Sequence, residues 1–425
     1  MKIAAEVTAE IGNDRFAGAV GMLSSCGCEI SSARLAAKNA GRAVYDFHLT
    51  YTDIGEFKKA LSWFEDELNG CRIVSIKNYL DEMIRSGLVT VTGSMPIDNI
   101  EDYQMNVLGV SHLVREKILE SENPAEESGI TRSVGLISCI RDKSERQKKM
   151  APLLHADAEI AAAVLGKFGG LNGYPVIVRY DLQEDLVKYL KALEPGFSGF
   201  RIDHIDDDET PDIYEQIADE LSIPVVSAKY DEMPVFILAA LHKIVKKHRY
   251  RTKDCNVGFI GLDVSAMRLA RLLRRAGFMR VLGFDNNEKS MFQFERESGL
   301  ATTPENIVSN AEIVVLLKNQ FSETDLVRMR PGLSVISMLD DPEAEELFSK
   351  RKGFGDIVTG EWADSATLYP GMLKGKAGSQ RAGIDDSAVI AMAEMLANED
   401  VPSGQFLPDV FSGIHDKIAA CVAGE

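Results

Sequence analysis

The apolar positions of residues 1–85 alternate between strand and helix spacing in the order β-α-β-β-α-β. Residues 2–8 alternate as a strand, and residues 14–25 have helical spacing that ends before Gly27. Four further segments, a hairpin followed by an amphipathic helix and a last strand, are predicted at 28–37, 43–52, 56–68 and 71–76. In that helix we expect Phe57, Leu61 and Phe64 to face inward.

This order and size resemble those of an ACT domain. The resemblance implies that the segment pairs with a second copy of itself and binds a small-molecule effector such as an amino acid. It rests on topology rather than on a motif, so an unrelated ferredoxin-like sandwich is the alternative.

Beyond a helix-rich stretch at 86–128, strands and helices alternate from residue 134 onward. The pattern predicts strands at 134–140, 175–180, 199–202 and 224–227, and helices at 158–165, 183–192, 212–221 and 234–247. Regular alternation of this kind indicates an α/β fold with a parallel sheet.

Residues 256–285 form the clearest unit of the chain. A buried strand at 257–260 precedes a turn at Gly261, a helix at 264–276 and a second strand at 281–284. This is the β-α-β arrangement that opens a Rossmann fold. Strands at 312–317 and 333–338 are expected to continue the sheet.

The turn of this unit is a candidate dinucleotide site. The three glycines of a G-x-G-x-x-G fingerprint correspond to Gly261, Asp263 and Ala266. Asp263 would put a negative charge where the pyrophosphate approaches the helix N-terminus, although an aspartate there also serves as a helix cap. Asp285 ends the second strand, where an acid would hold a ribose hydroxyl of NAD.

Composition and charge narrow the class of protein. The chain is 45% hydrophobic with a formal net charge of −18, which is typical of a globular protein and argues against a general nucleic-acid binder. No membrane span, secretion signal or disulfide framework is apparent, so we expect a cytoplasmic protein with six reduced cysteines. We expect Arg268, Arg271, Arg274 and Arg275, all in the helix 264–276, to form a solvated face.

Several short segments from about residue 94 to the C-terminus resemble the malic enzyme family. They occur in the family's order, at 95–103, 170–175, 203–205, 221–225, 238–241, 339–342 and 369–375. An ACT domain ahead of a malic enzyme body is a known arrangement. The resemblance implies an ACT-like regulatory domain at 1–85, a substrate domain at 86–247, and a Rossmann-type NAD-binding-like domain at 248–425 whose C-terminal helices return to the cleft.

Malic enzymes oxidise and decarboxylate malate with NAD(P), a divalent metal, a lysine base and a tyrosine acid. The resemblance places Val107 at the tyrosine position and Ala161 at the lysine position. Its metal pair corresponds to Asp203 and His204, while Lys229 falls within the segment of the third ligand and would put an ammonium where a cation belongs. A salt bridge between Lys229 and Asp203 could instead replace the metal.

Two functional hypotheses follow. In the first, the chain is a malic enzyme homologue that has lost malate oxidation and acts as a homodimeric regulatory or scaffold protein responding to a ligand. In the second, it is a divergent NAD-dependent oxidoreductase on another small acid, with Lys229 and Asp231 as catalytic residues, Asp203 and His204 in the cleft and Asp285 on the ribose. A third, weaker hypothesis is that the chain is a subunit that dimerises with an active paralogue.

Overall fold

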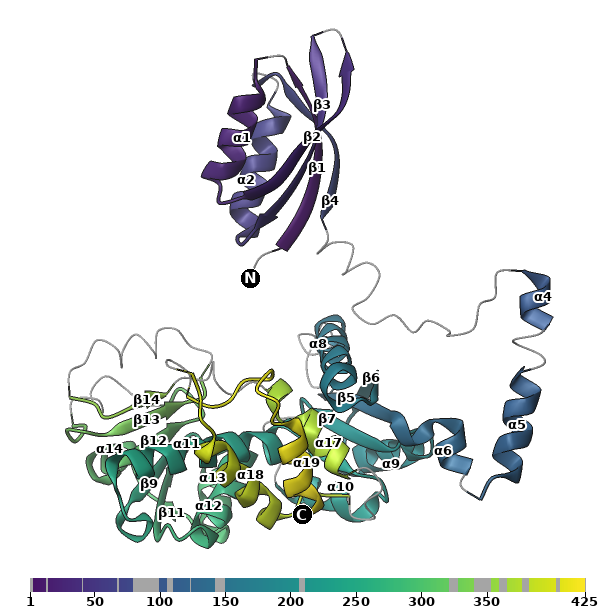
Figure 1. The fold of residues 1–425 in the computed structure, drawn as a ribbon. Helices are drawn as coiled ribbons and strands as arrows, with labels where there is room; N and C mark the ends of the chain where they lie inside the picture. The colour runs from purple at the N-terminus through teal and green to yellow at the C-terminus, as the bar shows by residue number, and fades with distance from the viewer. Residues whose placement is uncertain are drawn as a thin grey trace. The chain divides into compact units, whose positions relative to one another are not determined.

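The computed structural model describes most of the chain (Figure 1). The described residues are 3–12, 14–39, 41–66, 69–78, 99–104, 110–122, 124–141, 150–205, 211–320, 328–339, 353–358, 365–376, 382–402 and 406–424. The chain divides into two compact units, Met1–Thr92 and Gly93–Glu425. None of the helices in the described part has the length and apolar run needed to cross a membrane.

The first unit is an antiparallel sheet with two helices on one face (Figure 1). Its elements are β1 (Ile3–Gly12), α1 (Phe16–Ser25), β2 (Glu29–Asn39), β3 (Arg42–Tyr51), α2 (Ile54–Glu65) and β4 (Cys71–Asn78), and the strand order is β2-β3-β1-β4. Phe57 and Phe64 are buried in its core and Leu61 packs against it. The predicted element order is confirmed; the ACT identity stays a prediction.

In the second unit the helices α4 (Ile100–Asp102), α5 (Val110–Glu120) and α6 (Pro124–Ser128) precede a four-stranded parallel sheet. The strands β5 (Ser133–Arg141), β6 (Asn172–Tyr180), β7 (Gly199–Asp203) and β8 (Val225–Ser227) lie in the order β6-β5-β7-β8. The helices between them are α8 (Ala151–Val164), α9 (Gln183–Leu193) and α10 (Pro211–Glu220). Each predicted strand of this region is present. The apolar runs of β5, β7 and β8 are buried on both faces, whereas β6 lies at the edge of the sheet and is partly exposed.

A six-stranded parallel sheet follows in the same unit, with the order β11-β10-β9-β12-β13-β14. Its strands are β9 (Asn256–Ile260), β10 (Arg280–Phe284), β11 (Leu300–Ala301), β12 (Ile313–Leu316), β13 (Ser334–Ser337) and β14 (Ile357–Val358). Three helices connect β9 to β10, β10 to β11 and β11 to β12: these are α12 (Val264–Arg275), α13 (Glu288–Arg296) and α14 (Pro304–Asn310), respectively. This strand order is that of a Rossmann fold, and it confirms the predicted fold class.

Helices tie the two parallel sheets together. A π-helical turn, η6 (Ala228–Glu232), leads from β8 into α11 (Met233–His248), which packs on α12 and α18 (Asp386–Asn398). Helix α17 (Tyr369–Lys376) packs on β7, β8 and α19 (His415–Ala423). The two sheets therefore meet along η6, α11 and the C-terminal helices.

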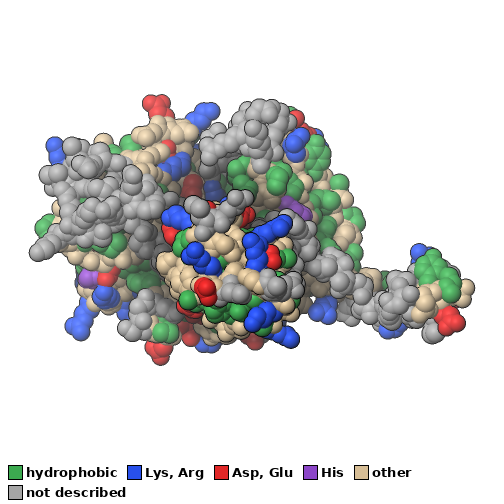
Figure 2. All heavy atoms as spheres, turned by 90° about the horizontal axis from the view of Figure 1, so that it is seen from above, with side chains coloured by type: hydrophobic (Ala, Val, Ile, Leu, Met, Phe, Trp, Pro, Cys, Tyr) green, Lys and Arg blue, Asp and Glu red, His purple; other side chains and the backbone are tan. Residues whose placement is uncertain are grey.

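The surface has mixed charge. On the face shown in Figure 2, basic and acidic side chains are intermingled among the described residues rather than separated into large patches of one sign. All six cysteines are free, and five of them are buried. The reduced thiols predicted from the sequence are present.

The contact between β6 and α8 leads to a stability prediction. A Cβ atom added at Gly173 would lie 2.8 Å from the Ala162 Cα atom, which is backbone and cannot turn away. We expect Gly173→Ala to lower the free energy of unfolding by about 1–3 kcal/mol through overpacking. At Gly196 an added Cβ atom meets nothing within 4 Å, so Gly196→Ala is the matched control. Urea unfolding followed by circular dichroism measures both; equal midpoints would contradict the prediction.

Candidate functional site

A buried ion pair occupies the junction between β7 and η6. Arg201 donates from Nε to Glu232 Oε1 (2.8 Å) and from Nη2 to Glu232 Oε2 (3.1 Å). The two residues are 8% and 1% exposed, so both charges are removed from water and each depends on the other. This two-point geometry holds the end of the first parallel sheet against the turn that leads into α11.

The predicted metal pair lies beside this ion pair. Arg201 Nη1 is 3.4 Å from Asp203 Oδ2, and Asp203 Oδ1 accepts from the His204 backbone N–H (2.8 Å). A guanidinium against the carboxylate opposes a divalent cation. Among the described residues no group of three metal-binding side chains is present, so this site does not fit a metal. Asp203 is paired with Arg201, and not with Lys229 as the alternative proposed.

The position predicted for the family's lysine makes contacts within the protein. Ala161 is half-buried in α8, and its carbonyl oxygen accepts a hydrogen bond from the Tyr369 hydroxyl (2.8 Å). The guanidinium of Arg201 lies 4.5 Å from the centre of the Tyr369 ring. Tyr369 thus links the predicted lysine position on α8 to the Arg201–Glu232 pair. Val107, at the predicted tyrosine position, lies outside the described residues.

Asp231 belongs to a second buried ion pair. Its Oδ2 accepts from the Ser227 backbone N–H (2.6 Å), and its Oδ1 is bonded to Arg268 Nη1. Burial raises the pKa of Asp231 above its ordinary value, and the Arg268 guanidinium opposes that shift. Both carboxylate oxygens of Asp231 are therefore bonded within the protein, as in a carboxylate with a structural role. Lys229 is half-buried one turn away, and its carbonyl oxygen accepts from Ser265 Oγ (2.7 Å).

Arg268 connects three segments of the second unit. Besides Asp231, it donates to the Tyr230 carbonyl (2.8 Å) and to the Ile384 carbonyl (2.6 Å), and it lies 3.4 Å from Asp386. Arg268 is 2% exposed, so the solvated face predicted for the α12 arginines is wrong at this position. Arg271 and Arg275 also pair with Asp386, at 3.3 and 2.7 Å.

The predicted nucleotide turn is present after β9. Gly261 has φ +88°, and a Cβ atom there would lie 2.5 Å from the Lys318 backbone nitrogen. Only glycine fits both the backbone conformation and this close approach. The tight turn of a dinucleotide fingerprint is thus preserved.

The helix N-terminus that would face a pyrophosphate is occupied by the chain itself. Asp263 caps α12, and its Oδ1 accepts from the backbone N–H groups of Ser265 (2.9 Å) and Ala266 (3.1 Å). Ser265 and Ala266 are fully buried, and the Ser265 hydroxyl contacts η6. Because the cap already satisfies these donors, they are not open to a phosphate.

Asp285, the predicted ribose-binding acid, is also engaged. Its Oδ2 accepts from Leu262 N (2.7 Å) and Lys318 Nζ (2.9 Å), and its Oδ1 accepts from Asn287 N (2.9 Å) and Gln320 Nε2 (3.3 Å). A carboxylate has about four lone-pair positions, and these four donors use them. Burial opposes ionisation of Asp285, but the two backbone N–H groups and Lys318 outweigh it and hold its pKa below the ordinary value.

Sequence reasoning missed several residues of this site. Arg201 and Glu232 were not singled out, although an arginine within the buried strand Phe200-Arg201-Ile202 is a signal, because a buried charge needs a partner. Asp386 and Lys318 carry no comparable signal. Their roles depend on chain segments far apart in the sequence.

Comparison with known proteins identifies distant relatives of this chain. No protein-family model matches it. It is 25% identical over 264 residues to NAD-dependent malic enzyme 1 of Bacillus subtilis (strain 168), a match covering 61% of this chain and 60% of that enzyme. It is 19% identical over 373 residues to the NAD-dependent malic enzyme of Geobacillus stearothermophilus, covering 81% and 78%.

Solved structures share the fold. The NAD-dependent malic enzyme from Thermotoga maritima matches with a TM-score of 0.65 and 16% identity, covering 81% of this chain and 98% of that one. The malic enzyme from Pyrococcus horikoshii Ot3 matches with a TM-score of 0.62 and 18% identity, covering 79% and 86%. The resemblance predicted from the sequence is confirmed at this level: the chain is a distant homologue of NAD-dependent malic enzymes.

The Arg201–Glu232 pair leads to a second stability prediction. We expect Arg201→Met to lower the free energy of unfolding by about 3–5 kcal/mol, because Glu232 is left buried without its partner. The double variant Arg201→Met with Glu232→Leu should regain most of that loss. Lys188→Met, which breaks the exposed Lys188–Asp185 pair, is the control and should cost about 0.5 kcal/mol or less. Urea denaturation would refute the prediction if Arg201→Met and the control cost the same.

Asp285 leads to a prediction about pH. Its folded-state pKa lies below 3.8, so its stabilising contribution is present above that value and is lost as the pH falls through the folded-state pKa. The stability difference between the wild-type protein and Asp285→Asn should be constant from about pH 7 to 5 and should shrink below about pH 4. Thermal unfolding of both proteins across this range measures it. A difference that does not change with pH would contradict the prediction.

Proposed function

We propose that this chain is a malic-enzyme-like protein that does not oxidise malate and acts as a regulatory or scaffold protein responding to a small ligand. Its relatives are NAD-dependent enzymes by name, and it has their fold. The observation that carries the proposal is the nucleotide turn. The donors and the acid that would hold NAD are bonded within the chain.

The energetics of the turn support this proposal. A bound dinucleotide would bring phosphate charge towards Asp263 and would have to displace Lys318 from Asp285. Two like charges about 4 Å apart repel by about 4 kcal/mol at an intermediate dielectric constant. Both costs weaken dinucleotide binding.

The cleft supports the proposal independently of the nucleotide. At the position of the family's base stands Ala161, whose carbonyl is held by Tyr369. The carboxylate of Asp203 faces the Arg201 guanidinium, where the family has its metal. At these two positions the described residues offer neither a base for a malate hydroxyl nor an open set of ligands for a cation.

We assign the ligand response of this proposal to the N-terminal unit. Its βαββαβ topology supports this assignment because it resembles that of ACT domains, and a homodimer would bring two such units together. The second unit would then respond to whether the N-terminal unit has bound its ligand, and it would not catalyse a reaction.

Calorimetric titration with NADH and NADPH, with and without Mn²⁺, tests the proposal on the purified full chain. We expect no heat of binding from either nucleotide, and no NADH formation from malate and NAD. The Bacillus subtilis NAD-dependent malic enzyme is the positive control, and circular dichroism confirms that the chain is folded.

NADH binding at micromolar affinity would overturn the proposal and favour a divergent NAD-dependent oxidoreductase. A screen of small hydroxy acids would then follow. Turnover that is lost in Lys229→Ala would assign the base of such an enzyme.

A further inference from the structure

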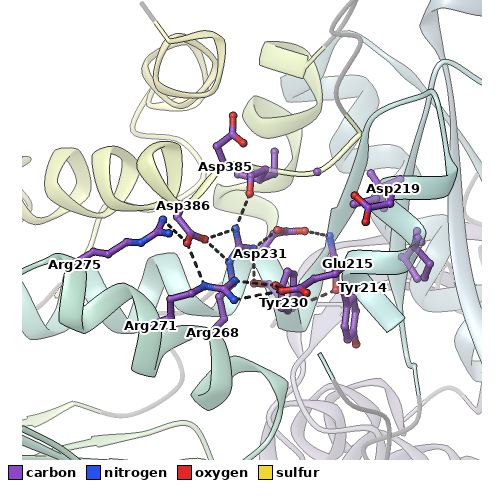
Figure 3. A pocket seen from close by; sticks show the side chains of 17 residues that line it. Tyr214, Glu215, Asp219, Tyr230, Asp231, Arg268, Arg271, Arg275, Asp385 and Asp386 are labelled. Carbon is purple, nitrogen blue, oxygen red and sulfur yellow. Dashed lines mark hydrogen bonds and ion pairs between the residues drawn. The ribbon is translucent and has the colours of Figure 1, made fainter. Parts of the chain in front are cut away.

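A pocket of about 380 Å³ opens between α10, α12 and the segment that leads into α18 (Figure 3). Its floor is apolar and includes Ile202, Ile217 and Val225. Its walls are charged. It lies on the α10 side of the first parallel sheet, whereas Tyr369 and Ala161 belong to the site described above. A volume of this size suits a small metabolite.

One wall of the pocket is cationic. The spacing of Arg268, Arg271 and Arg275 places all three on one face of α12, and Figure 3 shows them converging on Asp386. Their side-chain exposure rises from 2% to 30% to 58% along this face. Arg268 is therefore part of the closed interior, while Arg271 and Arg275 line the accessible part.

Arg275 is the arginine of this wall with hydrogen-bonding capacity to spare. Arg271 is bonded to Asp386, Glu215, Glu297 and the Tyr230 hydroxyl, at 3.1 to 3.3 Å. Arg275 pairs with Asp386 (2.7 Å), its one ion-pair partner among the described residues. A guanidinium carries five N–H donors, so a carboxylate on a ligand would complete the coordination of Arg275.

The facing wall is acidic. Glu215 and Asp219 lie one turn apart on α10, so they present their carboxylates on the same side of the helix. Glu215 accepts from the Tyr230 hydroxyl (3.1 Å) and pairs with Arg271 (3.3 Å), so it is already engaged within the protein. In the described part of the chain Asp219 has neither a hydrogen bond nor an ion pair. A cationic group on a ligand would therefore meet Asp219.

We infer that this pocket binds a small zwitterion of the α-amino acid class. Its carboxylate would pair with Arg275, its ammonium would face Asp219, and its side chain would lie on the apolar floor. A ligand held this way contacts α10 and α12 together, and so stabilises the junction between the two parallel sheets. This inference does not depend on whether the chain binds NADH.

The test is a binding screen on the full chain. The standard amino acids are tested singly at millimolar concentrations by thermal shift, and the best one is titrated by calorimetry. It is compared with its decarboxylated amine and its deaminated acid. We expect at least one amino acid to raise the melting temperature, and both analogues to bind about tenfold or more weakly, because each lacks one charge-assisted contact.

Variants locate the site. Arg275→Gln and Asp219→Asn should each weaken binding about tenfold or more. Two matched controls remove a charge from the same helices outside the pocket: Arg274→Gln on α12, which loses a bond to the Met279 carbonyl, and Glu220→Gln on α10, which loses its pair with Lys191. Both should bind within about twofold of the wild-type protein.

Three results would overturn the inference. The first is that no amino acid shifts the melting temperature. The second is that the amine or the acid binds as tightly as the amino acid. The third is that binding is unchanged in both pocket variants, which would place the ligand elsewhere in the chain, such as the N-terminal unit.

Discussion

The buried guanidinium of Arg268 joins three segments of the second unit. It binds Asp231 and the Tyr230 carbonyl on η6, the Ile384 carbonyl before α18, and Asp386 at the start of α18. A buried charge is costly unless the surrounding groups pair with it. The position of α12 against the first sheet therefore depends on these partners, together with the Ser265–Lys229 hydrogen bond and the contacts of Arg271.

The state of the nucleotide turn follows from this anchoring. With α12 held against η6, Ser265 at its first turn is buried and bonded to the Lys229 carbonyl. Asp263 caps the helix, and Lys318 reaches Asp285 from the end of β12. The glycine turn of a dinucleotide site remains, but its polar groups now stabilise the protein. A Rossmann fold does not by itself imply a bound dinucleotide, so the function has to be argued from these groups.

The same segment, η6, separates two regions of different character. On one side, Arg201, Glu232 and Tyr369 pack closely together. On the other side, Tyr230 and Asp231 border the charged pocket beside α10 and α12. The side of η6 near Arg201 is therefore filled by side chains, whereas the side near α10 and α12 holds a pocket. A ligand of the second unit would bind in that pocket.

Local pattern alone determined much of this molecule. The alternation of apolar runs, the glycine at 261 and the cap at 263 are read within a few residues, and the strands, helices and turn formed as they predict. The partners of the charged groups were decided by tertiary structure. Arg201 meets Glu232 across 31 residues, Asp285 meets Lys318 across 33, and Arg268 meets Asp386 across 118. The period of the apolar residues predicts which face of an element is buried. A charged side chain meets its partner only when the elements have packed against one another. Those pairings decided which polar groups of the candidate sites are already bonded within the protein.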